Sequence, residues 1–217
     1  MNPLSDLRSL NSMETAYYYM DLSKSEDELR SGLEVRCRNA INKFERQYLD
    51  IFVIRKASID DLDDIWGLYC KTMDRTQLPF HPKEELEFYL KYKYCNFYLA
   101  LYKSEDKDEL VPACTINIGE YKDTGVYWLS YTNDEYISTN IATYLLWYAI
   151  LETKKHGVVH FDCGNEVFCD VESKANKISV FKRGFGGELK YKYFMIKESE
   201  SRLFIAAVKK LVRSKIR

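Results

Sequence analysis

Apolar and polar positions along the chain repeat at spacings that predict helices and strands in turn. Residues 1–22 show no sustained period and are predicted to form an arm or a strand. From Ser25, which forms a capping box with Glu28, apolar residues recur at helical spacing. These residues are Leu29, Leu33, Cys37, Ala40, Ile41 and Phe44. One long amphipathic helix is therefore expected in this region.

The middle of the chain reads as a strand, two helices and three more strands. The β-branched run 51–54 predicts a strand, and a second capping box, Ser58 with Asp61, predicts the helix that follows it. Pro82 is typical of the first turn of another helix. Charged or glycine-containing turns then separate apolar runs, which favours an antiparallel meander. The three strands are predicted at 97–102, 112–118 and 126–131.

The last third of the chain alternates between helix and strand. An apolar helix at 141–151 is ended by Gly157, and a short buried strand is expected at 158–161. A helical segment at 175–182 leads into a final strand at 190–196. A basic amphipathic helix is predicted after it.

This order of elements predicts an α+β domain built on one mixed central sheet with flanking helices. No stretch of the sequence resembles an interdomain linker. We therefore expect one domain over residues 23–198, preceded by an arm at 1–22 and followed by the basic helix at 199–217.

Composition and charge narrow the class of protein. With 217 residues and 46% hydrophobic content, the chain can bury a substantial core. A net charge of −1 argues against a uniformly basic nucleic-acid-binding surface. Six cysteines without a CxxC pair, and no signal sequence, predict a cytoplasmic protein with reduced thiols. The longest apolar run is about half of the roughly 20 residues that span a bilayer, so no membrane span is expected.

Two short passages carry the most specific signal. Phe161-Asp162-Cys163-Gly164-Asn165 is followed, after a spacer, by Phe181-Lys182-Arg183-Gly184-Phe185-Gly186-Gly187. Together they resemble the Fem family of the GNAT acyltransferase superfamily, in which a strand ends in an Asp-x-Gly-Gly type turn and a Phe-Lys-x-x-Phe-Gly signature follows. Asn165 stands where that family more often has a second glycine.

The resemblance extends back through Arg38, Lys43, Thr72 and Arg75, and it covers roughly residues 18–196. It implies a GNAT-like fold. Fem enzymes usually contain two GNAT-like domains, whereas this chain is long enough for one. The chain thus resembles the second half of a Fem enzyme or a one-domain relative.

The resemblance implies that Lys182 holds the end of a tRNA and stabilises the transition state. Acyl transfer to an amine passes through a tetrahedral oxyanion, which a fixed positive charge stabilises. Asp162, at the end of a predicted buried strand, would orient the attacking amine or accept its proton, or else cap the following turn. His160 shares its strand face and is more typical of a satisfied core histidine. Cys163 and Cys169 lack metal-ligand spacing, so no metal site is expected.

Further residues are candidates for binding substrate. Phe181 and Phe185 would offer rings on which an adenine stacks, or would both belong to the core. Arg38, Lys43 and Arg75 would grip phosphate groups of a nucleotide-linked donor or acceptor, or would be ordinary surface cations.

The nature of the acyl donor divides the functional hypotheses. Acetyl-CoA-dependent GNAT enzymes cradle pyrophosphate on a glycine-rich loop that opens a helix. The corresponding segment here, residues 132–139, has no glycine and two acidic residues, which weakens the case for acyl-CoA.

Three hypotheses remain open. The first is transfer of an aminoacyl group from aminoacyl-tRNA, or of another acyl group, to an amine of a nucleotide-linked or lipid-linked peptidoglycan or envelope-glycan precursor. The tRNA acceptor end would then be a partner, with no tightly bound cofactor. The second is acyl-CoA-dependent acylation of an amino sugar or small amine in surface-polysaccharide synthesis. The third is a catalytically silent GNAT-like module that binds RNA or a partner through the basic C-terminal helix.

Overall fold

The computed structural model describes residues 10–104, 109–166 and 174–197. The chain divides into two compact units, residues 17–189 and residues 1–16 with 190–217. The larger unit holds all six α-helices of the described residues and most of the sheet. The predicted C-terminal helix at 199–217 lies outside the described residues.

The helices follow the predicted order, with one correction at the start. The expected long helix is two helices, α1 (Glu26–Ser31) and α2 (Val35–Gln47), because the chain breaks at Gly32. Both capping boxes, at Ser25 with Glu28 and at Ser58 with Asp61, are confirmed. The other helices are α3 (Leu62–Thr76), α4 (Lys83–Lys91), α5 (Ile141–Lys155) and α6 (Lys174–Arg183). Short 3₁₀ segments lie at η2 (Leu49–Ile51), η3 (Ile59–Asp61) and η4 (Asp134–Thr139).

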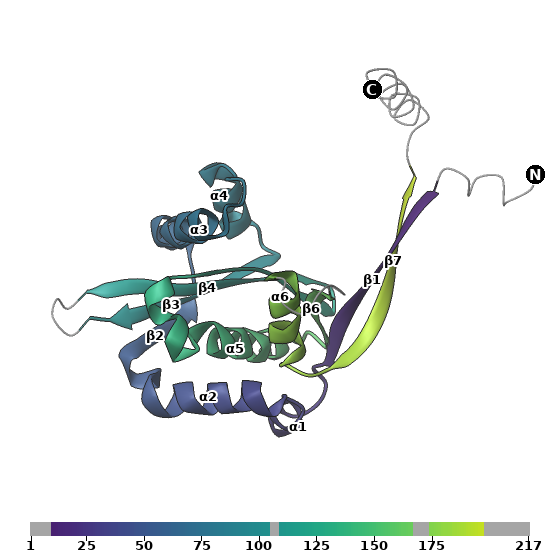
Figure 1. The fold of residues 1–217 in the computed structure, drawn as a ribbon, viewed down its shortest axis with the longest axis horizontal. Helices are drawn as coiled ribbons and strands as arrows, with labels where there is room; N and C mark the ends of the chain where they lie inside the picture. Colours follow the sequence, from purple (N-terminus) through teal and green to yellow (C-terminus); the bar gives the residue numbers. More distant parts are fainter. Residues whose placement is uncertain (1–9, 105–108, 167–173, 198–217) are drawn as a thin grey trace, which may run out of the picture. The chain divides into compact units, whose positions relative to one another are not determined.

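Seven strands form one mixed sheet in the order β2-β3-β4-β5-β6-β1-β7 (Figure 1). The strands are β1 (Leu10–Asp21), β2 (Phe52–Lys56), β3 (Cys95–Lys103), β4 (Leu110–Tyr121), β5 (Thr124–Thr132), β6 (His160–Glu166) and β7 (Glu188–Lys197). The predicted antiparallel meander is confirmed for β3, β4 and β5, and β2 joins it antiparallel to β3. β6 then runs parallel to β5, after the crossover through α5.

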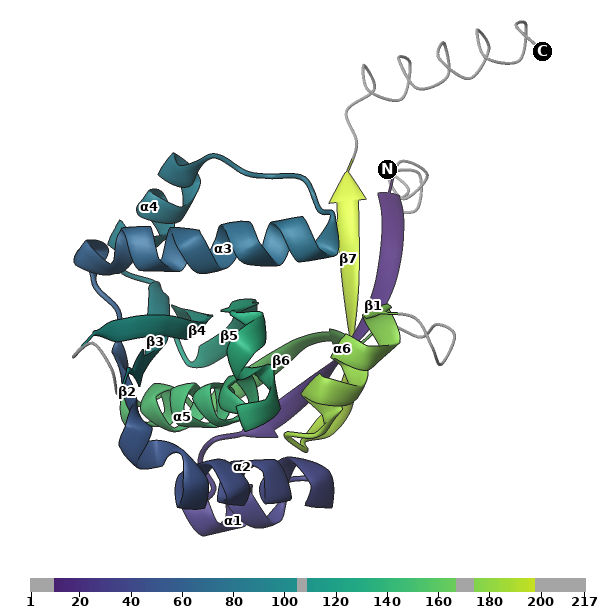
Figure 2. The same cartoon turned by 60° about the vertical axis from the view of Figure 1, so that its left-hand side comes forward.

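The central strands β3 and β4 are largely buried because helices cover both faces of this part of the sheet (Figures 1 and 2). Figures 1 and 2 show α3 and α4 over one face and α2 and α5 over the other. Along β3, Tyr98 and Ala100 join the cluster under α2 and α5, while Phe97, Leu99 and Leu101 join the cluster under α3 and α4. This alternation follows from the two-residue period of a strand. It explains why β3 reads as a continuous apolar run.

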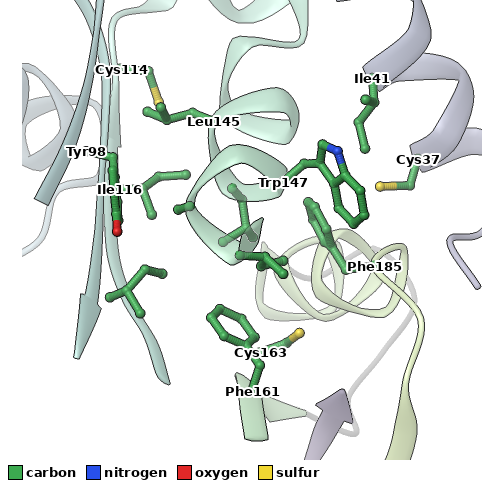
Figure 3. Close-up of a cluster of buried hydrophobic side chains, with 14 of the residues drawn as sticks. Cys37, Ile41, Tyr98, Cys114, Ile116, Leu145, Trp147, Phe161, Cys163 and Phe185 are labelled. Atoms are coloured by element: carbon green, nitrogen blue, oxygen red, sulfur yellow. The ribbon is translucent and has the colours of Figure 1, made fainter. Parts of the chain in front are cut away.

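The larger of the two clusters packs α5 between the sheet and α2 (Figure 3). Ile141, Leu145, Leu146, Ala149 and Ile150 of α5 are fully buried. Within the described residues, none of the helices has the length and apolar character needed to cross a membrane.

Candidate functional site

The candidate site lies beside the parallel strands β5 and β6, which pair only over their first residues. β5 and β6 pair from Thr124 with His160 to Val126 with Asp162. Beyond these residues the described strands run on to Thr132 and Glu166 without further pairing. We call the stretch between Tyr127 on β5 and Gly164 on β6, where the two strands no longer pair, the β5–β6 gap.

A tight turn on β6 forms one wall of the gap. The backbone N–H of Gly164 donates to Oδ1 of Asp162 at 2.7 Å. Gly164 has a φ of +87°, in the region that favours glycine. Asp162 is only 3% exposed. The turn-capping alternative for Asp162 is thus what the structure shows, and a role for Asp162 in catalysis stays a prediction.

Lys182 of α6 reaches across to this turn. A β-carbon built on Gly164 would lie 2.8 Å from Nζ of Lys182 and 3.4 Å from the carbonyl oxygen of Tyr127. The ammonium group therefore packs against the bare Cα of Gly164, beside the carbonyl of Tyr127, in the β5–β6 gap. The sequence prediction paired Lys182 with Asp162, and the structure places both at the same turn.

Burial and nearby charges shift the pKa of Cys163, the residue between Asp162 and Gly164. Burial raises the pKa of the Cys163 thiol, the carboxylate of Asp162 raises it further, and the charge of Lys182 opposes them. Cys163 is fully buried, with its sulfur 3.6 Å from that of Met20. A neutral, buried thiol is a core group and not a nucleophile.

The remaining residues of the 181–187 passage hold α6 in place. Phe185 is 1% exposed and lies beside Trp147 in the core (Figure 3), so for this ring the core alternative is correct. Phe181 is half-buried, 5.4 Å from the ring of Phe185 between centroids. A β-carbon on Gly186 would lie 2.3 Å from the carbonyl oxygen of Gly32. The turn after α6 therefore requires glycine for close backbone approach.

Strand β5 carries a β-bulge next to Tyr127. Asn117 of β4 pairs with Leu129, but the next residue, Ile118, pairs with Tyr127, so Trp128 is an extra residue on β5. Bulges re-aim side chains and are frequent beside active sites. Trp128 is 54% exposed despite its large ring. No motif or period in the sequence indicated this bulge.

A groove of about 570 Å³ opens between α2, α6 and the start of α5. Phe181 lines it, as predicted for a binding residue, together with Cys37 and Ala40 of α2. The cations that line it are Arg36 and Lys177. Neither is a candidate from the sequence, although Arg36 lies one helical turn before Ala40 on α2.

The other predicted cations lie elsewhere. Nη1 of Arg38 donates to the carbonyl oxygen of Ser31 at 3.2 Å. Nζ of Lys43 lies 5.9 Å from the ring centroid of Tyr48. Neither residue lines the groove. Their phosphate-binding role remains a prediction, and these contacts are those of surface cations.

Arg75 contacts residues 132–139, the segment that corresponds in the sequence to the pyrophosphate-binding loop of CoA-dependent GNAT enzymes. It forms an ion pair with Asp134 and donates to the carbonyl oxygen of Thr132 at 3.4 Å. At the other end of this loop, the N–H of Ile141, the first residue of α5, donates to Oγ1 of Thr139 at 3.3 Å. A helix N-terminus binds anions through its unpaired N–H groups. Here a side chain already occupies the first of them.

His160 differs from its expected place in the core. Its side chain is 41% exposed, and Nε2 lies 3.6 Å from Oδ2 of Asp123. Nδ1 forms a hydrogen bond with the hydroxyl of Tyr19. The histidine has polar partners, as predicted, but it is not buried.

No family model and no curated protein matches the sequence. Solved structures do match the fold. One is FemX, with 11% identity and a TM-score of 0.75 over 88% of this chain and 63% of that chain. The fold is GNAT-like. The predicted α+β class with a mixed sheet is thus confirmed.

Two further solved structures share this fold. The C-terminal domain of a putative lysylphosphatidylglycerol synthetase from Agrobacterium fabrum matches with 11% identity and a TM-score of 0.63, over 94% of this chain and 66% of that chain. L-PGS from Bacillus licheniformis matches with 15% identity and a TM-score of 0.57, over 95% of this chain and 68% of that chain. This chain spans about two thirds of the length of these structures.

Proposed function

We propose that this protein transfers an aminoacyl group from aminoacyl-tRNA, or another acyl group, to an amine of a peptidoglycan or other envelope-glycan precursor. The observation that carries the proposal is the position of Lys182, whose ammonium group lies in the β5–β6 gap against Gly164. The names of the structural neighbours, FemX and lysylphosphatidylglycerol synthetase, fit an aminoacyl group as the cargo. The Fem-like motif gives Lys182 the same role.

The chemistry asks for one positive charge at the reacting carbonyl. When the amine attacks, a C–N bond forms and the carbonyl oxygen becomes an oxyanion; the C–O bond to the donor then breaks, and the leaving oxygen takes the amine's proton. An ammonium group held at the oxyanion stabilises this intermediate. A charge-assisted hydrogen bond contributes about 1.5 to 3 kcal/mol, or roughly 10- to 150-fold in rate. Positioning of the two substrates supplies the remainder.

Asp162 acts in this proposal as a positioning residue. Its Oδ1 fixes the N–H of Gly164, which keeps the turn in the conformation against which Lys182 packs. A carboxylate that is 3% exposed has little access to an incoming amine. The proton of the amine therefore leaves by way of the leaving group or solvent, and not through Asp162.

The start of α5 favours a donor other than acyl-CoA. Thr139 caps the first N–H of the helix, and Asp134 and Glu135 stand in the first turn of η4. Asp134 is neutralised by Arg75, but Glu135 would repel a pyrophosphate. Among the described residues, the groove beside α5 is lined by two cations, Arg36 and Lys177, against one carboxylate, Glu34. With the ring of Phe181 on its wall, this lining suits the phosphates and a base of a tRNA end.

The proposal is tested by comparing donors. The purified protein is incubated with tRNA charged with a mixture of labelled amino acids, or with labelled acetyl-CoA, and with an extract of nucleotide-linked and lipid-linked envelope precursors. We expect label to appear in a precursor from charged tRNA and not from acetyl-CoA. Transfer from acetyl-CoA alone would favour the amino-sugar alternative. Transfer from neither donor would contradict the proposal and favour a non-catalytic binding module.

A further inference from the structure

A second cavity, of about 310 Å³, lies on the other face of β5, beneath α3 and α4. We call it the aromatic pocket. Rings from three separate elements line it, together with one carboxylate and one imidazole. The residues are Trp66, Tyr69, His81, Pro82, Glu85, Leu86, Tyr89, Trp128, Leu129 and Tyr131.

The rings of the pocket pack on one another and form a rigid wall. Trp66 stacks on Tyr69 with centroids 4.9 Å apart, and Tyr69 meets Tyr131 edge-on at 5.2 Å. On the opposite side, Tyr89 lies 5.2 Å from Trp128. Aromatic rings carry negative charge on their faces, so a cluster of them attracts a cation that loses its water.

Glu85 is the charged group of the pocket. Oε1 accepts a hydrogen bond from the hydroxyl of Tyr89 at 2.9 Å, and Oε2 lies 3.0 Å from Nδ1 of His81. A carboxylate has about four acceptor positions, so two of them remain for a ligand. The side chain is 38% exposed and hence reachable from solvent. Its two partners hold the carboxylate in place.

Tyr131 also lines the pocket and carries a hydroxyl group. The residue is 7% exposed, and its hydroxyl makes no hydrogen bond to the described part of the chain. Burial, and then Tyr69 and Glu85 nearby, raise the pKa of Tyr131, so the phenol stays neutral. A neutral phenol oxygen accepts a hydrogen bond as readily as it donates one.

We propose that the aromatic pocket binds a primary ammonium group. The rings attract the positive charge, while the Glu85 carboxylate and the Tyr131 oxygen accept its N–H groups. In the part of the chain that the structure describes, no lysine or arginine is among the lining residues, and Lys83, which follows Pro82 in the chain, is paired with Asp63. The described lining holds one carboxylate, Glu85, which would repel an anionic ligand.

The position of the pocket links it to the transfer chemistry. Trp128, the bulge residue, lines the pocket, while the carbonyl of its neighbour Tyr127 faces Gly164 in the β5–β6 gap. If the proposed function holds, the amine that receives the acyl group is an alkyl amine bound in this pocket, and this part of the inference rests on the proposed function. The binding of a primary ammonium group by the pocket does not depend on the proposed function.

Tryptophan fluorescence measures this binding directly. Two of the three tryptophans, Trp66 and Trp128, line the pocket, and Trp147 is buried in the cluster on the other face of the sheet. The probes are n-butylammonium, neutral n-pentanol of similar shape, and tetramethylammonium, which has no N–H. We expect saturable quenching by n-butylammonium, with at least tenfold weaker binding of the other two. Equal or tighter binding of either one would overturn the proposal.

Variants of one helix give the matched comparison. Glu85→Gln should weaken n-butylammonium binding at least tenfold, while Glu87→Gln, which removes an exposed carboxylate paired with Lys91 on the same helix, should leave it unchanged. Equal affinities for the two variants, at equal thermal stability, would overturn the inference. Wild-type protein that binds n-butylammonium but transfers nothing would contradict the proposed function alone. Transfer to amines without such binding would contradict this inference alone.

Discussion

Replacing Gly164 by alanine tests whether the position of the Lys182 ammonium group, and not only the stability of the fold, determines the rate of acyl transfer. The new β-carbon would lie 2.8 Å from Nζ, whereas ordinary contacts begin at about 3.4 Å, so the ammonium must retreat by about 0.6 Å. A hydrogen bond lengthened by that amount is largely lost. We expect the transfer rate to fall about 10- to 150-fold, which is the loss of one charge-assisted hydrogen bond.

Gly157→Ala is the matched control for backbone strain. Gly157 has a φ of +85°, close to the +87° of Gly164, but a β-carbon added there would have no atom within 4 Å. Both variants should lose about 1 to 2 kcal/mol from the left-handed backbone conformation, or roughly 2 to 8 °C in Tm for a chain of this length. The entropy effect of alanine on the unfolded chain is the same for both.

The assay combines a thermal melt with the rate of acyl transfer for each variant. The two Tm values should agree within a few degrees, while only Gly164→Ala loses activity. The double variant Gly164→Ala with Lys182→Met should be no slower than Lys182→Met alone, since both changes remove the same interaction. If Gly164→Ala transfers as fast as Gly157→Ala, the assignment of the β5–β6 gap as the reaction site is refuted.

Two further predictions concern the aspartates. Asp162→Asn keeps an oxygen that can accept the N–H of Gly164, so it should retain most of the transfer rate, whereas Asp162→Ala should lose it; a large loss in the asparagine variant would instead identify Asp162 as a base. The hydrogen bonds from Arg55 lower the pKa of Asp61, which is 6% exposed. Because a lowered folded-state pKa adds stability above the unfolded value of about 3.9, that stability should disappear as the pH falls below about 4. Melts of wild type and Asp61→Asn from pH 6 to 3 test this, and identical pH profiles would contradict it.

The order of elements could be predicted from the sequence because its signals are local. Ser25 with Glu28, and Ser58 with Asp61, are three residues apart, and both form the expected capping boxes. The three strands of the meander are bounded by turn residues, and their antiparallel pairing is confirmed. Gly157 ends α5 as expected, with a positive φ. Each of these features depends on neighbours in the chain.

The break between α1 and α2 could not be predicted from the local sequence. Leu29, Leu33 and Cys37 keep the four-residue spacing across it and are all buried, so the apolar period continues through the break. Gly32 ends α1, and a contact with a residue 150 positions away in the sequence accompanies the break. The N–H of Glu34 donates to the carbonyl oxygen of Gly184 at 2.9 Å. A tertiary contact thus replaces the helical one, which no local pattern reveals.

The sequence predicts only those parts of the candidate site that lie in a local motif. The Fem-like motif points to Asp162, Lys182 and Phe181, and the structure brings Lys182 to the turn that Asp162 caps. The aromatic pocket was missed, since α3, α4 and β5 each contribute rings that look like ordinary core residues in sequence. The exposure of Trp128 follows from a bulge in the pairing of β4 with β5. Register is a property of two strands and cannot be read from one.

The most direct test of the account is the single-turnover rate of Lys182→Met with a charged-tRNA donor and an amine acceptor. Lys155→Met, which removes an exposed lysine paired with Glu152, is the matched control. We predict a loss of about 10- to 150-fold for Lys182→Met and no change for Lys155→Met, at equal stability. A Lys182→Met variant that transfers the acyl group at the wild-type rate would contradict the central claim that the ammonium in the β5–β6 gap stabilises the transition state.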